Sequence, residues 1–538
     1  MRKAITIALI MIVAICTACN KKQVNKQNEK LFYAIEEENY QAVKECLEDK
    51  NLDLEHLKLS DRTQFAKKDQ RALGLAMEQI SEIEGSEQIS LLLIKAGADV
   101  NSFKGLNTYL QIAASNKKYE LVKALVEAGA SVNKRGKENG YRALDQIVSQ
   151  ISTKDEKDSQ QIIEYLTKKG AIFDNDTLKS VMNGEWRYKY TTKIIKEIKK
   201  QGNTIKISKA LEAAIEGNNK DLQKYIRDKK INKKDEKNII LYASANCNLR
   251  TVKMLYQEGY DFKIVDDYAM NPLHIASLYN NEFVVKFLCD KKLDSGPRYK
   301  EDEVENYSAL DYAVISGNEK KYKYLSKQKS TKINQKSMWE AATIYGNEDS
   351  IRLLKENLYK PNETEILQGY MQGNDKAIKG LINQKYTINI IKGDFISRSS
   401  IRTIKKLYQK TNVKISQDEM ESLVIARENK FIKAIIKEKR YQGTQNKERL
   451  LYYAVDTGNL ELVKYFIKLG VDINKVIEIE GNQSSALHRA AERSSKEILK
   501  YMINKGGDIH KKNGEGKDAI QIAKDGGYEE NEKLLKGE

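Results

Sequence analysis

The chain repeats a short pattern at a nearly fixed interval, and this feature restricts its possible folds more than any other. Leu110 and Leu144 lie 34 residues apart, and Leu487 and Ile520 lie 33 residues apart. Intervals of this size are typical of solenoids built from helix pairs. Six segments align on this anchor position: TYLQIA (108–113), RALDQI (142–147), NPLHIA (271–276), SALDYA (308–313), SALHRA (485–490) and DAIQIA (518–523).

The columns of this alignment indicate where helices begin. Pro272 occupies the second column, which suits the first position of a helix because its missing N–H would have no partner there. The last column is alanine in all segments except the one ending at Ile147, and small side chains let neighbouring helices approach closely. The first column holds side chains that can accept hydrogen bonds from the free amides of a helix start. They are Thr108, Asn271, Ser308, Ser485 and Asp518, with Arg142 as the exception.

A second helix is expected about fifteen residues after each start, where apolar residues recur with helical spacing. Such segments include ELVKALVEAGA (120–130), FVVKFLCDKK (283–292), ELVKYFIKLGV (461–471) and EILKYMINKGG (497–507). Several of them end in glycine, the residue that most readily ends a helix in a left-handed conformation. A short polar segment, here called a finger, then leads to the next repeat.

This order of helix, turn, helix, glycine and finger resembles the ankyrin-repeat family. NPLHIA, followed by NNEFVVKFL, is closest to the family pattern Thr-Pro-Leu-His-x-Ala. We therefore expect an all-α fold, an ankyrin-type helix-turn-helix solenoid of many repeats, some of them degenerate.

His274 raises the question whether this position does chemistry. The fourth position of the six segments reads Gln111, Asp145, His274, Asp311, His488 and Gln521. A catalytic imidazole could not be exchanged for Gln or Asp at equivalent positions, whereas a hydrogen-bonding group that ties one loop to the next could be. The resemblance implies the same role, since the ankyrin histidine bonds the turn of the adjacent repeat. Asn271, Pro272, His274 and His488 are thus expected to be structural.

The regularity of the repeats suggests how the chain is divided. Residues 148–205 and 383–420 fit the pattern poorly, and 290–306 is expected to be an inserted finger. The expected parts are a signal peptide (1–18), a lipidated cysteine with a flexible tether (19–30), N-terminal repeats that degenerate toward 148–205 (31–205), central repeats (206–445), and C-terminal repeats with a cap (446–538).

The N-terminus indicates export. Two basic residues precede the apolar stretch AITIALIMIVAICTA (4–18), which is short for a transmembrane helix. Thr17, Ala18 and Cys19 resemble the processing site of bacterial lipoproteins, in which the cysteine carries the lipid. Cys16 departs from that pattern, where leucine is usual.

The lipoprotein resemblance implies a location. Cys19 would anchor the chain to the cell envelope, and Asn20 would favour the outer membrane of two-membrane bacteria, with the protein on the periplasmic face or at the cell surface. Two alternatives remain open from the residues themselves: a secretory signal cleaved after Ala18, and an uncleaved anchor.

Motifs for catalysis, metals or cofactors are not found. DKNLDL (49–54) begins like a calcium loop but lacks the required Gly and Glu, and NGEGKDA (513–519) lacks the first Gly and the Ser or Thr of a phosphate loop. No enzyme activity, cofactor or metal is expected. Cys46, Cys247 and Cys289 are expected to be buried thiols, and a bridge between Cys247 and Cys289 is possible without being implied.

These observations favour a non-enzymatic scaffold that is tethered to a membrane and binds a protein partner on the concave face of its repeats. The finger positions Lys104, Arg135, Lys137, Asp267 and Tyr268 are candidate contacts.

The alternative is a charge-driven structural protein that binds anionic lipid or polysaccharide. Removal of residues 1–18 would lower the formal net charge only from +17 to +15. Nucleic acid is not an expected partner of an exported chain, and no small-molecule cofactor is expected.

Overall fold

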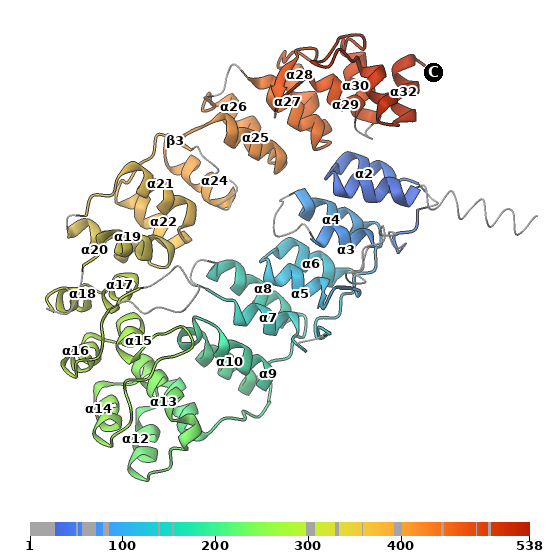
Figure 1. The fold of residues 1–538 in the computed structure, drawn as a ribbon. Coiled ribbons are helices and arrows are strands. Elements are labelled where there is room, and N and C mark those ends of the chain that lie inside the picture. The colour runs from blue at the N-terminus through green and yellow to red at the C-terminus, as the bar shows by residue number, and fades with distance from the viewer. Residues whose placement is uncertain are drawn as a thin grey trace, which may run out of the picture. The chain divides into compact units, whose positions relative to one another are not determined.

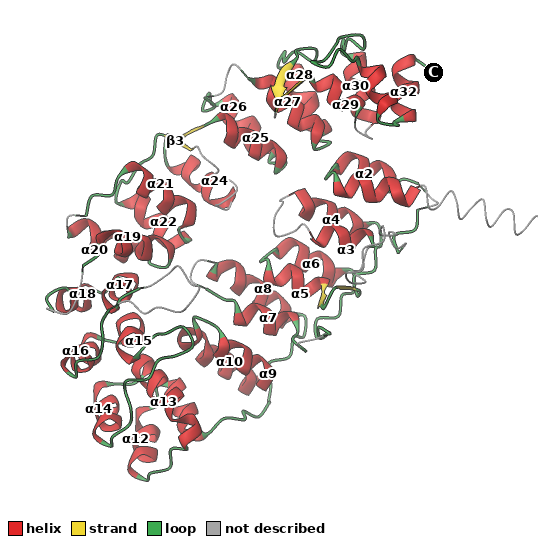
Figure 2. Ribbon diagram, viewed as in Figure 1, coloured by secondary structure: helices red, strands yellow, loops and turns green. Residues whose placement is uncertain are grey.

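The computed structural model describes residues 27–49, 52–55, 71–78, 85–137, 140–152, 155–296, 307–328, 333–357, 359–391, 401–442, 446–479, 481–492 and 496–538. The expected signal peptide, Cys19 and most of the inserted finger at 290–306 lie outside the described residues. Nearly all described elements are helices, with a few short strands between them (Figure 2).

The chain divides into two compact units. The first comprises the residues up to Ala143 together with Ile390–Asp394 and Lys414–Glu538, and the second comprises Leu144–Asn389 and Phe395–Val413. The boundaries expected after residues 205 and 445 mark changes in the regularity of the repeats, and they stay a prediction. Residues from Leu144 to 205 belong to the second unit, together with the repeats up to Asn389.

The first unit begins with a helix over residues 27–36, so residues 27–30 belong to the first helix pair and not to the expected tether. Its further helices are α2 (Tyr40–Cys46), α3 (Ala72–Glu78), α4 (Gly85–Lys95), α5 (Tyr109–Ser115), α6 (Tyr119–Glu127), α25 (Gln417–Ile425), α26 (Asn429–Lys437), α27 (Lys447–Asp456), α28 (Leu460–Lys468), α29 (Ala486–Ala491), α30 (Lys496–Asn504), α31 (Ala519–Asp525) and α32 (Glu529–Lys536).

The second unit is a run of helix pairs (Figure 1). Its helices are α7 (Ala143–Ser149, which starts at the boundary), α8 (Glu156–Lys168), α9 (Asn175–Asn183), α10 (Arg187–Lys200), α11 (Lys209–Glu216), α12 (Asn219–Arg227), α13 (Lys233–Asn246), α14 (Leu249–Gln257), α15 (Pro272–Tyr279), α16 (Glu282–Asp290), α17 (Ala309–Ile315), α18 (Glu319–Leu325), α19 (Gln335–Ile344), α20 (Glu348–Glu356), α21 (Glu363–Gln372), α22 (Asp375–Asn383) and α24 (Ile401–Lys410). The poorly fitting stretch 148–205 therefore still forms helices.

The strands are short. An antiparallel hairpin joins β1 (Phe103–Lys104) to β2 (Asn107–Thr108), and another joins β5 (Ile477–Ile479) to β6 (Asn482–Ser484). Both hairpins are fingers. A third pair, β3 (Ile390–Ile391) and β4 (Lys414–Ile415), is parallel and lies in the first unit.

Each helix pair packs against its neighbours in the chain. First helices contact first helices, as in the series α11, α13, α15, α17 and α19, and second helices contact second helices, as in α12, α14, α16 and α18. The alanine column is buried at these contacts. The five expected helix starts are N-caps whose side chains accept hydrogen bonds from backbone amides. Pro272 is the first residue of α15. The expected fold class is confirmed.

The first helix pair contacts repeats at the other end of the sequence within the first unit. Lys30 Nζ lies 3.0 Å from Glu530 Oε1, and the hydroxyls of Tyr33 and Tyr528 lie 2.9 Å apart. The Arg427 guanidinium lies 4.2 Å from the centre of the Tyr40 ring, and the Gln41 side-chain amide donates a hydrogen bond to Glu497. Asn39, the N-cap of α2, is buried beside Gly458.

Gly458 offers a test of this contact. Its φ of +63° is left-handed, and a Cβ there would collide with the side-chain oxygen of Asn39. Gly470 has a φ of +80° but open space around it, so Gly470→Ala is a matched control. Both alanines should destabilise the C-terminal repeats by about 1 kcal/mol through backbone strain. Only Gly458→Ala should speed amide hydrogen exchange in residues 27–46, and equal exchange in the two variants would contradict the contact.

Candidate functional site

Both candidate histidines hold the finger that follows them. His274 is fully buried, its Nδ1 accepts the Asn271 amide at 3.4 Å, and its Nε2 lies 2.9 Å from the Gly296 carbonyl oxygen. Because Nδ1 accepts a hydrogen bond, Nε2 carries the proton and donates it to that carbonyl. His488 makes the same two contacts, with the Ser485 amide at 3.1 Å and the Lys511 carbonyl at 2.8 Å.

Other residues in the same column make equivalent bonds. Gln111 Nε2 donates to the Tyr141 carbonyl at 2.9 Å, and Asp145 accepts from the Thr177 hydroxyl at 2.8 Å. Each of these bonds reaches the following repeat. The shared geometry explains why His, Gln and Asp can replace one another here, and it leaves the imidazoles without access to a substrate.

Three of the five candidate finger positions lie together in the first unit. Lys104 is in the β1–β2 hairpin, and Arg135 and Lys137 are exposed on the next finger. The Lys137 amide donates to the Leu106 carbonyl at 2.8 Å, which ties the two fingers together. We call residues 103–108 and 131–137 the twin fingers.

The twin fingers combine an apolar tip with positive charge. Leu106, at the tip of the hairpin, is 48% exposed. The ammonium groups of Lys134 and Lys137 lie 4.4 Å and 4.5 Å from the centre of the Phe103 ring. Lys104 Nζ lies 2.7 Å from Glu78 Oε2. The exposed apolar tip and the positive charge therefore lie on adjoining fingers that share a backbone hydrogen bond.

The other two candidates, Asp267 and Tyr268, make contacts inside the second unit. Arg187 Nη1 lies 3.3 Å from Asp267 Oδ2, and the Tyr268 hydroxyl donates to the Asn183 carbonyl at 3.0 Å. The Arg187 guanidinium also pairs with Asp266 at 3.0 Å, and both of these side chains are buried. This finger thus fastens α10 to the repeat of α15, and a role in partner binding stays a prediction.

A second charged cluster joins α8, α10 and α22. Glu156 lies 2.9 Å from the ammonium groups of both Lys189 and Lys376. Burial alone would raise the pKa of Glu156, but the hydrogen bonds from the two lysines outweigh it and lower the pKa to about 2. Burial and then the charge of Glu156 raise the pKa of Tyr190. A carboxylate held ionised in this way is a poor general acid, so the cluster is structural.

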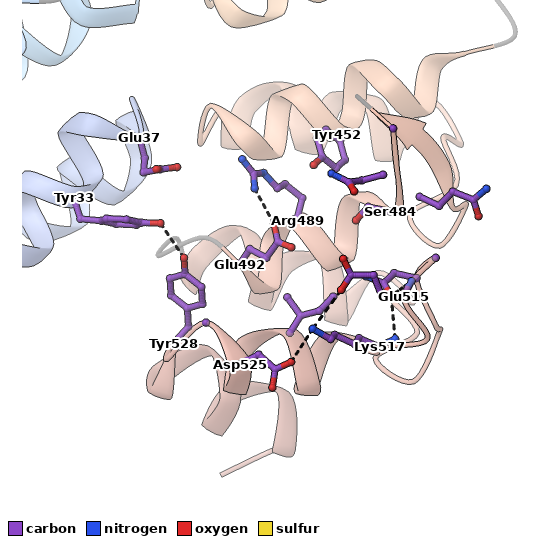
Figure 3. A pocket seen from close by; sticks show the side chains of 17 residues that line it. Tyr33, Glu37, Tyr452, Ser484, Arg489, Glu492, Glu515, Lys517, Asp525 and Tyr528 are labelled. Atoms are coloured by element: carbon purple, nitrogen blue, oxygen red, sulfur yellow. Dashed lines mark hydrogen bonds and ion pairs between the residues drawn. The ribbon is translucent and has the colours of Figure 1, made fainter.

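The first unit contains a pocket of about 790 Å³, large enough for a small ligand or a few side chains (Figure 3). One wall is the helix over residues 27–36, and the other is formed by the last repeats and their fingers. The lining residues are Tyr33, Glu37, Tyr452, Gly481, Asn482, Gln483, Ser484, Arg489, Glu492, Asn513, Gly514, Glu515, Lys517, Ile522, Asp525, Gly526 and Tyr528.

Sites of other kinds are not found in the described part of the chain. No group of three or more His, Cys, Asp or Glu residues there could hold a metal ion. Within the same residues, no helix has the length and apolar content needed to cross a bilayer. Cys46, Cys247 and Cys289 are free thiols, and burial raises the pKa of Cys247 to about 12, which makes it unreactive.

Comparison with known families agrees with this geometry. Residues 239–337 match a family model of ankyrin repeats in three copies, residues 451–503 match one of ankyrin repeats in many copies, and residues 106–137 match the single ankyrin repeat. No curated protein matches the chain. The chain thus contains ankyrin repeats in these three segments. Ankyrin repeats imply a protein-binding scaffold, and proteins of this kind are typically non-enzymatic.

One row of hydrogen bonds was not expected from the sequence. Asparagines in the turns between paired helices donate to backbone carbonyls of the preceding repeat. They are Asn246 to Ile215 (2.9 Å), Asn280 to Ser244 (2.9 Å), Asn347 to Ile315 (3.4 Å) and Asn374 to Ile344 (3.0 Å). The interval of 34 residues between Asn246 and Asn280 was the available signal, but Asn280 and Asn347 lie two repeats apart, so the sequence showed no regular row.

A buried lysine occupies the same row. Lys321 Nζ donates to the carbonyls of Ser277 at 2.6 Å and Asn280 at 3.1 Å. Burial lowers the pKa of Lys321 from 10.5 to about 8, and the charge of Glu282 offsets part of this effect. The lysine is 2% exposed, so it is not an accessible nucleophile.

This pKa predicts how stability depends on pH. Between pH 8 and 10.5 the unfolded chain holds a proton at Lys321 that the folded chain has released, so the Lys321 contribution to stability rises with pH and falls as the pH drops to 8. Across this interval, the free energy of unfolding of the parent should rise by about 3 kcal/mol more than that of Lys321→Met. Urea unfolding at pH 7 and pH 10.5 measures the difference. Lys320→Met, at an exposed neighbour, is the control and should show no such gain.

Proposed function

We propose that the protein is a lipid-anchored scaffold that binds a protein partner through the finger and first-helix side of its repeats, the side expected to be concave. The observation that carries this proposal is the pair of twin fingers, where Leu106 is exposed and where Arg135 and Lys137 are exposed on the finger that is bonded to it. Interfaces of this kind gain affinity from a few apolar and arginine contacts surrounded by polar groups.

The rigidity of the twin fingers supports the proposal. The hairpin pairs Phe103 with Thr108 and Lys104 with Asn107, and Thr108 is at the same time the N-cap of α5. The second finger is held by Asn101, which donates to the Gly129 carbonyl and accepts from the Ser131 amide, both at 2.9 Å. Side chains fixed in this way lose little conformational entropy when they bind.

Anchoring through Cys19 is the second part of the proposal. The basic start, the apolar stretch and the sequence Thr17-Ala18-Cys19 support it. A diacyl or triacyl group would hold the protein stably, because each buried methylene contributes about 0.8 kcal/mol. The proposed location is the outer membrane, on its periplasmic face or at the cell surface.

Partner binding can be tested by immobilising residues 20–538, which include every described element, and capturing the proteins that bind to them. We expect a polypeptide that is retained at low and moderate salt. Leu106→Ala combined with Lys137→Glu should weaken its binding at least tenfold, since about 1.4 kcal/mol of lost contact is tenfold in affinity.

Lys263→Glu is the matched control for this capture, because Lys263 is an exposed finger lysine of the second unit. It makes the same change of charge and should leave binding unaltered. Retention of anionic polymer alone, lost as salt is raised, would instead favour the charge-driven alternative.

Anchoring can be tested with two cysteine variants expressed from the full chain. Cys19→Ser should abolish lipid attachment and release the protein from the membrane fraction. Cys16→Ser changes a residue of the segment that would be cleaved, so the mature protein should still be lipidated. Mass spectrometry of the N-terminal peptide measures both outcomes, and a lipid-free N-terminus in the parent would refute this part of the proposal.

A further inference from the structure

We propose that four second helices of the second unit bind the anionic surface of a lipid bilayer. The surface concerned, here called the cationic face, consists of the solvent-accessible side chains of α12, α14, α16 and α18 and of the residues just after them, within 219–230, 249–258, 282–292 and 319–327. Neither Cys19 nor the twin fingers contribute to it, so this inference and the proposed function can fail separately. It also differs from the charge-driven alternative, because it assigns lipid binding to one face and leaves the fingers to a partner.

The cationic face carries an excess of basic side chains. Its helices form a row of their own, since α12, α14, α16 and α18 contact one another in succession (Figure 1). Apart from the buried Lys321, the four segments contain six acidic and thirteen basic residues. The acidic residues are Asp221, Asp228, Glu258, Glu282, Asp290 and Glu319, and the basic ones are Lys220, Lys224, Arg227, Lys229, Lys230, Arg250, Lys253, Lys286, Lys291, Lys292, Lys320, Lys323 and Lys327.

The first helices of the same repeats lack this excess. Together α11, α13, α15 and α17 contain four basic and five acidic residues. A general richness of the chain in lysine would add positive charge to both rows alike, so the excess is a property of the second helices. It also ends at the next second helix, α20, in which three acidic residues face two basic ones.

Much of this positive charge is not neutralised by neighbouring carboxylates. Lys230 pairs with Asp228 at 3.6 Å, and Lys320 pairs with Glu282 at 3.4 Å. Across the part of the chain that the structure describes, Lys253, Lys286 and Lys291 take part in no ion pair. Their ammonium groups lie near aromatic rings instead.

Aromatic rings and ammonium groups alternate where α14 meets α16. Lys291 Nζ lies 5.0 Å from the centre of the Tyr256 ring and 5.6 Å from the centre of the Phe287 ring. Lys253 Nζ lies 5.6 Å from the centre of the Phe287 ring. Lysine stems on aromatic surface, with their charged ends in solvent, are typical of protein surfaces at the boundary between headgroups and acyl chains.

Phe283 gives this face an apolar contact point. Its side chain is 58% exposed, more than any other large apolar side chain of the described residues. Lys286 Nζ lies 5.9 Å from the centre of its ring and 5.5 Å from the centre of the Tyr324 ring. The Phe283 ring can therefore enter the headgroup boundary of a bilayer while the ammonium group next to it stays among the phosphates.

Charge complementarity favours a bilayer over an acidic polypeptide. The basic residues are spread over four consecutive helices and match an extended layer of phosphate groups without any specific register. An acidic polypeptide would have to supply carboxylates over the same four helices together with an apolar contact for Phe283. An anionic bilayer supplies both through its headgroups and acyl chains.

The test is co-sedimentation of residues 20–538 with phospholipid vesicles. This chain includes every described element and lacks both Cys19 and the apolar stretch, either of which could bind vesicles by itself. We expect binding to mixed vesicles of phosphatidylglycerol and phosphatidylcholine that weakens as salt is raised, and little binding to pure phosphatidylcholine.

A triple variant tests whether the cationic face carries this binding. The substitutions Lys253→Gln, Lys286→Gln and Lys291→Gln together should weaken vesicle binding by about tenfold or more. The reason is that one basic residue near an anionic surface contributes about 1 kcal/mol, which is about fivefold in affinity.

The matched control makes the same change of charge on the first helices. It combines Lys209→Gln, Lys233→Gln and Lys234→Gln, which replace exposed lysines of α11 and α13, and it should leave vesicle binding nearly unchanged. Far-ultraviolet circular dichroism of both triple variants checks that the helices remain folded.

Phe283→Trp reports contact with the bilayer directly. The two tryptophans of the chain, Trp186 and Trp339, are buried. Addition of phosphatidylglycerol vesicles should therefore shift the emission of Phe283→Trp to shorter wavelength and leave that of the parent nearly unchanged.

The proposal would be overturned by absence of binding to the mixed vesicles, by equal binding to both vesicle types, by equal weakening in the two triple variants, or by an unshifted Phe283→Trp emission from the bound protein. Polyglutamate is titrated in parallel. If polyglutamate binds and the vesicles do not, the face belongs to an acidic polypeptide and the proposal is wrong.

Discussion

The structure depends on hydrogen bonds and burial shared between neighbouring repeats, because a single helix pair cannot bury its own apolar face. His274 shows this dependence directly. Its imidazole is buried, one nitrogen completes the N-cap of its own helix, and the other holds the next finger through Gly296. Removal of either partner would leave a buried polar group unpaired. Each repeat thus fixes the start of the next, and the positions of the fingers follow from that coupling.

Where the repeat pattern is weak, ion pairs between side chains tie the helices to one another instead. The stretch 148–205 lacks the anchor motif, yet α10 is held through Arg187 and Asp266, and α8 through Glu156 and Lys376. The Arg187–Asp266 pair is buried, and buried ion pairs add little net stability compared with apolar packing, although removal of one partner is costly. They therefore restrict how degenerate helices can dock, and Asp267 and Tyr268 take part in this restriction through Arg187 and Asn183.

The twin fingers and the pocket of the first unit are both formed by fingers that rigid helices hold in place. In the twin fingers, Leu106 and Lys137 are joined through the backbone, so an apolar tip and a cationic rim are presented together. In the pocket, the fingers near Gln483 and Gly514 are joined in the same manner, by a bond of 2.9 Å between the Gly514 amide and the Gln483 carbonyl.

The sequence by itself determined the helix pairs, their caps and the structural use of His274 and His488, because these features depend on residues within one repeat or its neighbour and recur with its period. Only the tertiary structure decided the contacts between distant repeats. Tyr33 and Tyr528 are 495 residues apart, and a bond of that separation leaves no periodic trace in the sequence. For the same reason the pocket could not be predicted, since its walls meet only after the first helix pair packs against the last repeats.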